Sequence, residues 1–282
     1  MQEHDLAQVE LRLGELGPAV DSTGLFQGAR RHLGTGGRRL RARLALDAGY
    51  RVGLTQSQRV AIASSCELLH NASLVHDDIQ DGDRDRRGHP AVWVDQGSAI
   101  AICVGDLFLS GAYAALAPLG TAAGALLGHV HARVAEVISG QAADLRTQPS
   151  NADCADYAAI AGAKSGGLLA LPLELSLLAA DRQEALPSAY EAAYELAIGY
   201  QIADDIADYE HDCGGDRLNM VAVAAAAGAA EPAAAAAEHS TDHLERALVA
   251  ARRLPAGSGT LLQQEAERLR SSVAWLAREV SA

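Results

Sequence analysis

The sequence predicts an all-α fold from three observations. Alanine and leucine dominate a chain whose aromatic content is only 4%, a composition that favours helices over strand-rich folds. Apolar residues recur at helical spacing in long stretches that glycine and proline interrupt. We also find no interdomain linker and no internal repeat of about 20–50 residues. We therefore expect one helical domain over residues 1–282.

The helical stretches follow one another along the chain. Glycine or proline breaks separate those of the first half, at residues 17–18, 34–37, 88–90 and 118–120. An alanine-rich, low-complexity segment over 222–240 is broken by Gly228 and Pro232. The predicted helical stretches are 6–16, 38–50, 56–78, 91–116, 123–145, 155–180, 188–212, 243–254 and 261–280.

The charge balance excludes some partners. With 23 basic and 36 acidic residues, the net charge is -13, so we expect no affinity for nucleic acid or anionic membranes. An anionic substrate would need a local arginine site or a metal ion.

Compartment signals are weak but consistent. The N-terminus MQEHDLAQ lacks a signal-peptide pattern, and the most apolar run, 168–180, contains Pro172 and Glu174. The cysteines show no metal-binding spacing, which suits buried, reduced thiols. We expect a cytoplasmic protein with no membrane span, zinc site or disulfide. The cysteines are Cys66, Cys103, Cys154 and Cys213.

Two aspartate triplets carry the chemistry. Asp77, Asp78 and Asp81 follow one apolar helical stretch, and Asp204, Asp205 and Asp208 repeat the same spacing after another. The outer two aspartates of each triplet are four residues apart and share a helix face, where their repulsion needs a cation to offset it. Oxygen ligands without histidine or cysteine suit Mg²⁺. A single triplet is as often a solvated acidic face; two copies favour a diphosphate held through metal ions.

Arginines supply a second anion site. Arg38, Arg39, Arg41 and Arg43 follow the Gly36-Gly37 break, while Arg84, Arg86 and Arg87 follow the first triplet. The planar guanidinium binds phosphate oxygens in pairs, although an arginine run by itself is more often a solvated face. Between the triplet and Arg86, Asp83 and Asp85 are expected to form a solvated linker.

From Gly36 to Asp216 the chain resembles the trans-isoprenyl diphosphate synthases, the polyprenyl synthetase family. The matching segments are GGRRLRA at 36–42, ELLHNASLVHDDIQD at 67–81, GQAADL at 140–145 and YQIADDIAD at 200–208. The resemblance implies a helical bundle of the isoprenoid synthase type with a central apolar cavity. It also implies a homodimer that joins isopentenyl diphosphate to an allylic diphosphate with Mg²⁺, three ions in the closed complex.

Residue roles follow from the same resemblance. Both aspartate triplets would bind metal and act in catalysis together with Arg86 and Lys164, the only lysine of the chain. Gln141 would belong to the central helices of the site. The residues expected to bind the two diphosphates are Arg38, Arg39, Arg41, His70, Arg86, Arg87, Lys164, Ser165 and Gln201.

The sequence departs from the family pattern at two places. Ala42 stands where proline is usual, and no lysine follows the second triplet, where Asp216 is in the expected place and Arg217 is the nearest substitute for a lysine. The second departure concerns the segment expected to close over the diphosphate.

Product length follows from residues one turn before the first triplet. Bulky aromatics there stop the product short in the family, whereas this chain has Ala72 and Ser73. We therefore expect a product of C20 or longer.

Three other functions compete with this one. A terpene cyclase or diphosphate lyase of the same fold would not need residues for isopentenyl diphosphate. The pairs His76-Asp77 and His211-Asp212 resemble those of the HD phosphohydrolases, but that function leaves the triplets and arginines unexplained. A noncatalytic partner subunit would be expected to have eroded aspartate motifs.

Overall fold

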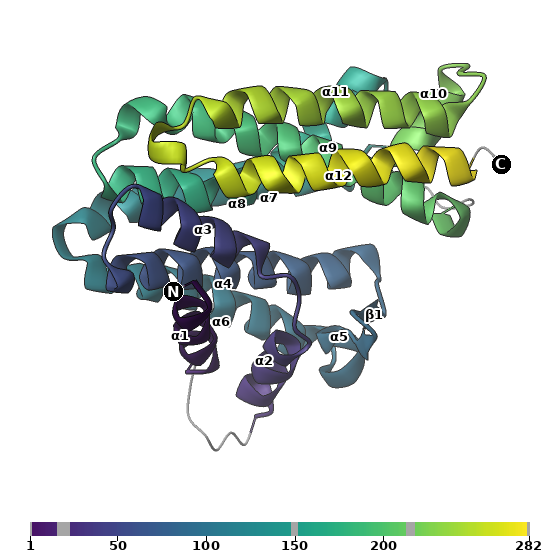
Figure 1. Cartoon of the computed structure of the whole chain (residues 1–282). Helices are drawn as coiled ribbons and strands as arrows, with labels where there is room; N and C mark the ends of the chain where they lie inside the picture. The colour runs from purple at the N-terminus through teal and green to yellow at the C-terminus, as the bar shows by residue number, and fades with distance from the viewer. Residues whose placement is uncertain (1, 16–22, 148–151, 213–217, 281–282) are drawn as a thin grey trace. The chain divides into compact units, whose positions relative to one another are not determined.

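The computed structural model describes the backbone of residues 2–15, 23–147, 152–212 and 218–280 (Figure 1). Side chains are described for all of these except residues 2, 210–212, 274 and 277–280. The all-α prediction is confirmed. The helices are α1 (Gln2–Gly14), α2 (Leu25–Gly34), α3 (Leu40–Arg51), α4 (Gln56–Asp81), α5 (Val92–Gln96), α6 (Ser98–Leu116), α7 (Ala123–Asp144), α8 (Cys154–Ala179), α9 (Leu186–Asp212), α10 (Met220–Ala226), α11 (Pro232–Arg252) and α12 (Thr260–Val280).

The chain groups into two compact units. One contains residues 1–128 with 178–180, and the other contains 129–177 with 181–282. The single domain over 1–282 and its central apolar cavity stay predictions.

Helix α4 is the centre of the first unit, where α1, α3 and α6 pack on it and α2 and α5 pack on α6. Thr55 begins α4 with a capping box, because its hydroxyl accepts from the Gln58 amide while the Gln58 side chain accepts from the Thr55 amide. Gly82 ends the helix in the left-handed conformation at φ 70°. Asp5 ties α1 to this helix by a 2.6 Å ion pair with Arg59. These contacts hold the first aspartate triplet at the end of a fixed helix.

A short hairpin follows α4, where the sequence predicted a solvated linker. Strands β1 (Asp85–Arg86) and β2 (His89–Pro90) pair antiparallel, and Arg87 and Gly88 form the turn at φ 56° and 76°. Positive φ at both central residues is typical of the tight hairpin turn that matches strand twist. The hairpin fixes the direction in which Arg86 and Arg87 leave the backbone.

The second unit packs α11 and α12 against α9, with α10 contacting α9 and α11. Helices α7 and α8 approach closely at Gly140, where an added Cβ would lie 2.4 Å from the Lys164 amide nitrogen. Asn219 begins α10, its side-chain oxygen accepting from the amides of Val221 and Ala222.

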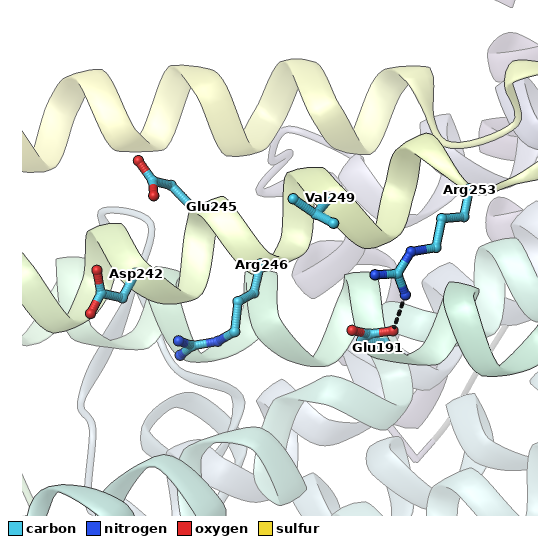
Figure 2. Close-up of a pocket in the computed structure, with 6 residues that line it drawn as sticks. All are labelled: Glu191, Asp242, Glu245, Arg246, Val249 and Arg253. Atoms are coloured by element: carbon cyan, nitrogen blue, oxygen red, sulfur yellow. Dashed lines mark hydrogen bonds and ion pairs between the residues drawn. The ribbon is translucent and has the colours of Figure 1, made fainter.

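An open groove of about 360 Å³ also lies in the second unit, lined by charges of both signs. Figure 2 shows Arg253 reaching Glu191 across it, at 3.0 Å. None of the predicted site residues lines this groove.

One helical stretch, Ser98–Asp144, is long and apolar enough to cross a membrane by length and composition alone, and 33% of its most apolar window is buried. A core helix passes the same test, so this is weak evidence for a span. Among the described cysteines, Cys66 is buried as expected, whereas Cys103 is exposed and Cys154 is partly exposed. The cytoplasmic location stays a prediction.

Candidate active site

The first triplet divides into two kinds of carboxylate. Asp77 and Asp81 are partly exposed at the end of α4. Asp78 is 1% exposed, and its Oδ1 accepts from Nε of Arg86 at 2.8 Å and from Nη2 of the same residue. Burial raises the pKa of Asp78 while Arg86 opposes that rise. Its Oδ2 is buried with no hydrogen-bond partner in the described part of the chain.

The second triplet divides in the same way. Asp205 is 7% exposed and is held by three donors: the Tyr157 hydroxyl at 2.6 Å, the Met220 amide at 2.7 Å and the Gln201 side chain at 3.3 Å. Asp204 and Asp208 are exposed. The protein around Asp204 desolvates its carboxyl group and, with the charges of Asp208 and Asp205, raises its pKa to about 7.

In both motifs the middle aspartate is therefore bound by the protein, while the outer two lie on the more open face. The described residues contain no group of three or more histidine, cysteine, aspartate or glutamate side chains that could hold a metal by itself. Mg²⁺ commonly takes only one or two carboxylates and completes its shell with phosphate oxygens and water. The raised pKa of Asp204 fits a cation that would neutralise its carboxylate.

A cluster of cationic residues lies in the first unit, where the Gly36-Gly37 turn meets the hairpin. Arg87 donates from Nη1 to the Gly36 carbonyl, and an added Cβ on Gly37 would lie 2.7 Å from the Arg87 guanidinium carbon. His70 lies near Arg41 and Arg87, and burial together with these charges lowers its pKa well below the usual range. His70 is consequently neutral at pH 7 and can donate one hydrogen bond without adding charge.

The arginines of the GGRRLRA segment differ from one another. Arg38 is exposed and Arg41 partly exposed, as substrate-binding side chains should be. Arg39 has a side chain only 6% exposed, which is ion-paired with Glu10 and Glu67 at 2.6 and 3.3 Å.

Lys164 lies on α8 within 2.6 Å of Asp144 at the end of α7. Ser165 next to it is partly exposed, and Gln141 is 7% exposed one turn before Asp144. Sequence reasoning missed Asp144, although its spacing from Gln141 in GQAAD places both on one helix face.

Comparison with known proteins shows the family of the chain. Residues 24–215, well over half of the chain, match the polyprenyl synthetase family. The chain belongs to the polyprenyl synthetase family. It is 32% identical over 199 residues to a short chain isoprenyl diphosphate synthase of Methanocaldococcus jannaschii, a match that covers 69% of this chain and 61% of the relative. It is 33% identical over 176 residues to (2E,6E)-farnesyl diphosphate synthase of Mycobacterium tuberculosis, a match that covers 60% of this chain and 48% of the relative.

The matches thus span about half to two thirds of the length of these curated relatives. Among solved structures, geranylgeranyl pyrophosphate synthetase from Pyrococcus horikoshii superimposes with a TM-score of 0.84 at 24% identity, covering 95% of this chain and 96% of the other. At that identity the likeness shows the fold, which is the isoprenoid synthase type expected from the sequence.

The chain also has a buried histidine that no motif indicated. His32 on α2 is 4% exposed, its ring lies 5.7 Å from that of Phe108, and its Nε2 has no hydrogen-bond partner among the described residues. Burial, with the charges of Arg87 and Arg86, lowers the pKa of His32 to about 4. A neutral imidazole can lie beside these arginines, whereas a charged one would repel them.

The two residues assigned to product length differ in exposure. Ala72 is 5% exposed, whereas Ser73 is partly exposed. Ser73 lies one turn before Asp77 on the same helix face, and its hydroxyl donates to the His70 carbonyl at 2.9 Å. Asp216 and Arg217 lie outside the described residues, as do the side chains of His211 and Asp212.

Proposed function

We propose that this chain is a prenyltransferase that condenses isopentenyl diphosphate with an allylic diphosphate, head to tail. The observation that supports this most is that the first unit alone carries two different anion-binding features. Asp77 and Asp81 suit a diphosphate bound through metal, while the cluster of Arg41, His70 and Arg87 suits one bound directly. A cyclase that consumes one prenyl diphosphate has no use for the second feature.

The aspartates and two cations would serve ionisation of the allylic substrate. Asp77, Asp81, Asp204 and Asp208 would hold Mg²⁺, which when bound neutralises charge on a departing diphosphate. Arg86 in the first unit and Lys164 in the second, each bound here to a carboxylate, Asp78 or Asp144, are cations that would stabilise negative charge on phosphate oxygens. Asp78 and Asp205 would orient their motifs from the protein side.

The cationic cluster would hold the second substrate. Arg38 and Arg41 would bind its diphosphate with Arg87, and neutral His70 would donate a hydrogen bond to it. With the double bond of isopentenyl diphosphate held near the allylic carbon, carbon–carbon bond formation would follow C–O cleavage. A proton then leaves the new chain, most simply to the released diphosphate, so no tuned side-chain base is required.

Product length is the finer part of the proposal. Ser73 lies on the partly exposed face of α4 that continues to Asp77, so its small side chain leaves room for a growing chain there. We propose a product of C20 or longer.

Incubation with labelled isopentenyl diphosphate and each allylic primer in turn, with Mg²⁺ or with EDTA, tests the function. Label in a longer prenyl diphosphate, formed only with Mg²⁺, is the expected result. Hydrocarbon or alcohol formed from the primer without label would favour a cyclase. No turnover of any primer would favour a noncatalytic subunit, and either result would contradict the proposal.

We also propose a homodimer. In the second unit two large apolar side chains are exposed seven residues apart, Ile138 at 61% and Leu145 at 51%, and in the first unit Ile102 is 49% exposed. A second copy that covers such side chains would gain roughly 25 cal/mol per Å² of apolar surface removed from water. Light scattering after size exclusion should give twice the 29.3 kDa chain mass. A monomer that binds lipid vesicles would instead favour a membrane-facing surface.

A further inference from the structure

We propose that Arg39 is a positioning residue rather than a diphosphate ligand, and that Glu10 of α1 and Glu67 of α4 hold it so that its neighbours can bind substrate. By this inference the first helix of the chain supports the isopentenyl diphosphate site. The inference rests on the proposed function and assigns different roles to adjacent arginines in that site.

The hydrogen bonds of Arg39 are the first line of support. Its Nε and Nη2 donate to the two carboxylate oxygens of Glu10 at 2.6 and 3.1 Å. Its Nη1 donates to Glu67 at 3.3 Å, and Nη2 also donates to the Leu33 carbonyl at 2.8 Å. These bonds use four of the five N–H donors of a guanidinium, and a diphosphate would have to displace carboxylates to reach it.

The backbone at Arg39 is the second line of support. Arg39 precedes α3 in the left-handed conformation, at φ 49° and ψ 38°, which is unfavourable for a residue with a Cβ. The four side-chain bonds and the burial of the side chain over-determine this conformation. Because the turn directly joins Arg38 to the first turn of α3, its geometry sets where Arg38 and Arg41 stand.

Glu67 links the turn to the rest of the cluster. It is 2% exposed, and its second oxygen accepts from the Ala42 amide at 3.3 Å, so one carboxylate holds both Arg39 and the start of α3. Its charge also favours the charged form of Arg87. One buried carboxylate thus offsets the mutual repulsion of the arginines, and Arg39 is the cation that pairs with it directly.

The ligand and positioning roles predict opposite results for Glu10→Gln. If Arg39 bound diphosphate, removal of the competing Glu10 charge would leave the affinity for isopentenyl diphosphate unchanged or raise it. If Arg39 is a positioning residue, loosening it weakens that affinity, about threefold or more for a coupled contact. The Kd for isopentenyl diphosphate, measured by calorimetry on the full chain, distinguishes the ligand role from the positioning role without requiring turnover.

Two variants on the same helix are the controls. Glu3→Gln makes the identical change at an exposed position. Asp5→Asn breaks the Asp5–Arg59 ion pair between α1 and α4, and should lower thermal stability without changing the Kd. If Asp5→Asn weakens binding as much as Glu10→Gln does, docking of α1 in general is responsible, and the assignment to Arg39 is overturned.

A double-mutant cycle completes the test. Arg39→Gln should weaken binding, and adding Glu10→Gln to it should cause no further loss, because both act through one contact. In the Arg38→Gln background the Glu10→Gln effect should be smaller than in the unaltered chain, because part of it acts through the position of Arg38. The KM for the allylic primer should stay unchanged in Glu10→Gln, which a general loss of structure would not allow.

Failure of the inference can be told from failure of the function. If the unaltered chain does not bind isopentenyl diphosphate, the proposed function fails and the inference with it. If the unaltered chain binds and Glu10→Gln binds equally well or better, only the inference is overturned.

Discussion

His32 gives the chain a pH-dependent stability whose size follows from its surroundings. Its pKa is about 4 in the folded protein and near 6.5 in an unfolded chain, because burial and the charges of Arg87, Arg86 and Arg39 disfavour the imidazolium. Between these pH values the unfolded chain binds a proton at this position that the folded protein does not. The free energy of unfolding therefore falls as pH falls through this window.

Each pKa unit of difference corresponds to about 1.4 kcal/mol, so this one histidine should remove about 2 kcal/mol by pH 5 and about 3 kcal/mol by pH 4. His32→Gln has no group that titrates there and should lose correspondingly less stability over the same range. Urea denaturation from pH 7 to pH 4.5 measures both proteins. His131→Gln, at an exposed position of α7, is the matched control and should follow the unaltered chain. Equal losses in His32→Gln and the unaltered chain would refute the assignment.

Four further substitutions test the site. Ser73→Phe should shorten the product, whereas Ala72→Phe should mainly lower the stability, by about 1–3 kcal/mol from overpacking. Product analysis and thermal melting measure the two effects, and the reverse pattern would contradict this placement. Tyr157→Phe removes a donor from Asp205 and should raise the Mg²⁺ concentration needed for half-maximal activity, because the second motif loosens; an unchanged Mg²⁺ titration would contradict that role. Gly37→Ala places a Cβ 2.7 Å from a guanidinium at φ 126° and should raise the KM for isopentenyl diphosphate but not for the primer; equal rises in both would show general damage.

The sequence predicted the helices and the two triplets because both follow from local spacing. Helical periodicity and the four-residue separation of Asp77 and Asp81 need no tertiary information. The hairpin over 85–90 was not predicted, since its turn depends on positive φ at an arginine, Arg87, a residue type with no preference for that conformation.

Partners distant in the chain could not be predicted either. The spacing of the motifs gives Asp78 and Asp205 the same metal-binding role as the other aspartates. In the structure Asp78 accepts from the hairpin, and Asp205 accepts from α8 and from α10. Arg39 is a similar case, because its acceptors Glu10 and Glu67 lie outside the motif that contains it. His32 belongs to no motif, and only burial beside arginines distinguishes it.

We propose that the chain binds two diphosphates in different ways, one directly and one through metal. Calorimetry with isopentenyl diphosphate, and separately with a non-ionisable allylic thiolodiphosphate, measures this on the unaltered chain, Arg41→Gln and Asp81→Asn. We predict that isopentenyl diphosphate binds in the presence of EDTA and that only Arg41→Gln abolishes this binding. The allylic analogue should bind only with Mg²⁺, and Asp81→Asn should abolish its binding. Isopentenyl diphosphate binding that requires Mg²⁺ and is lost in Asp81→Asn would contradict the account.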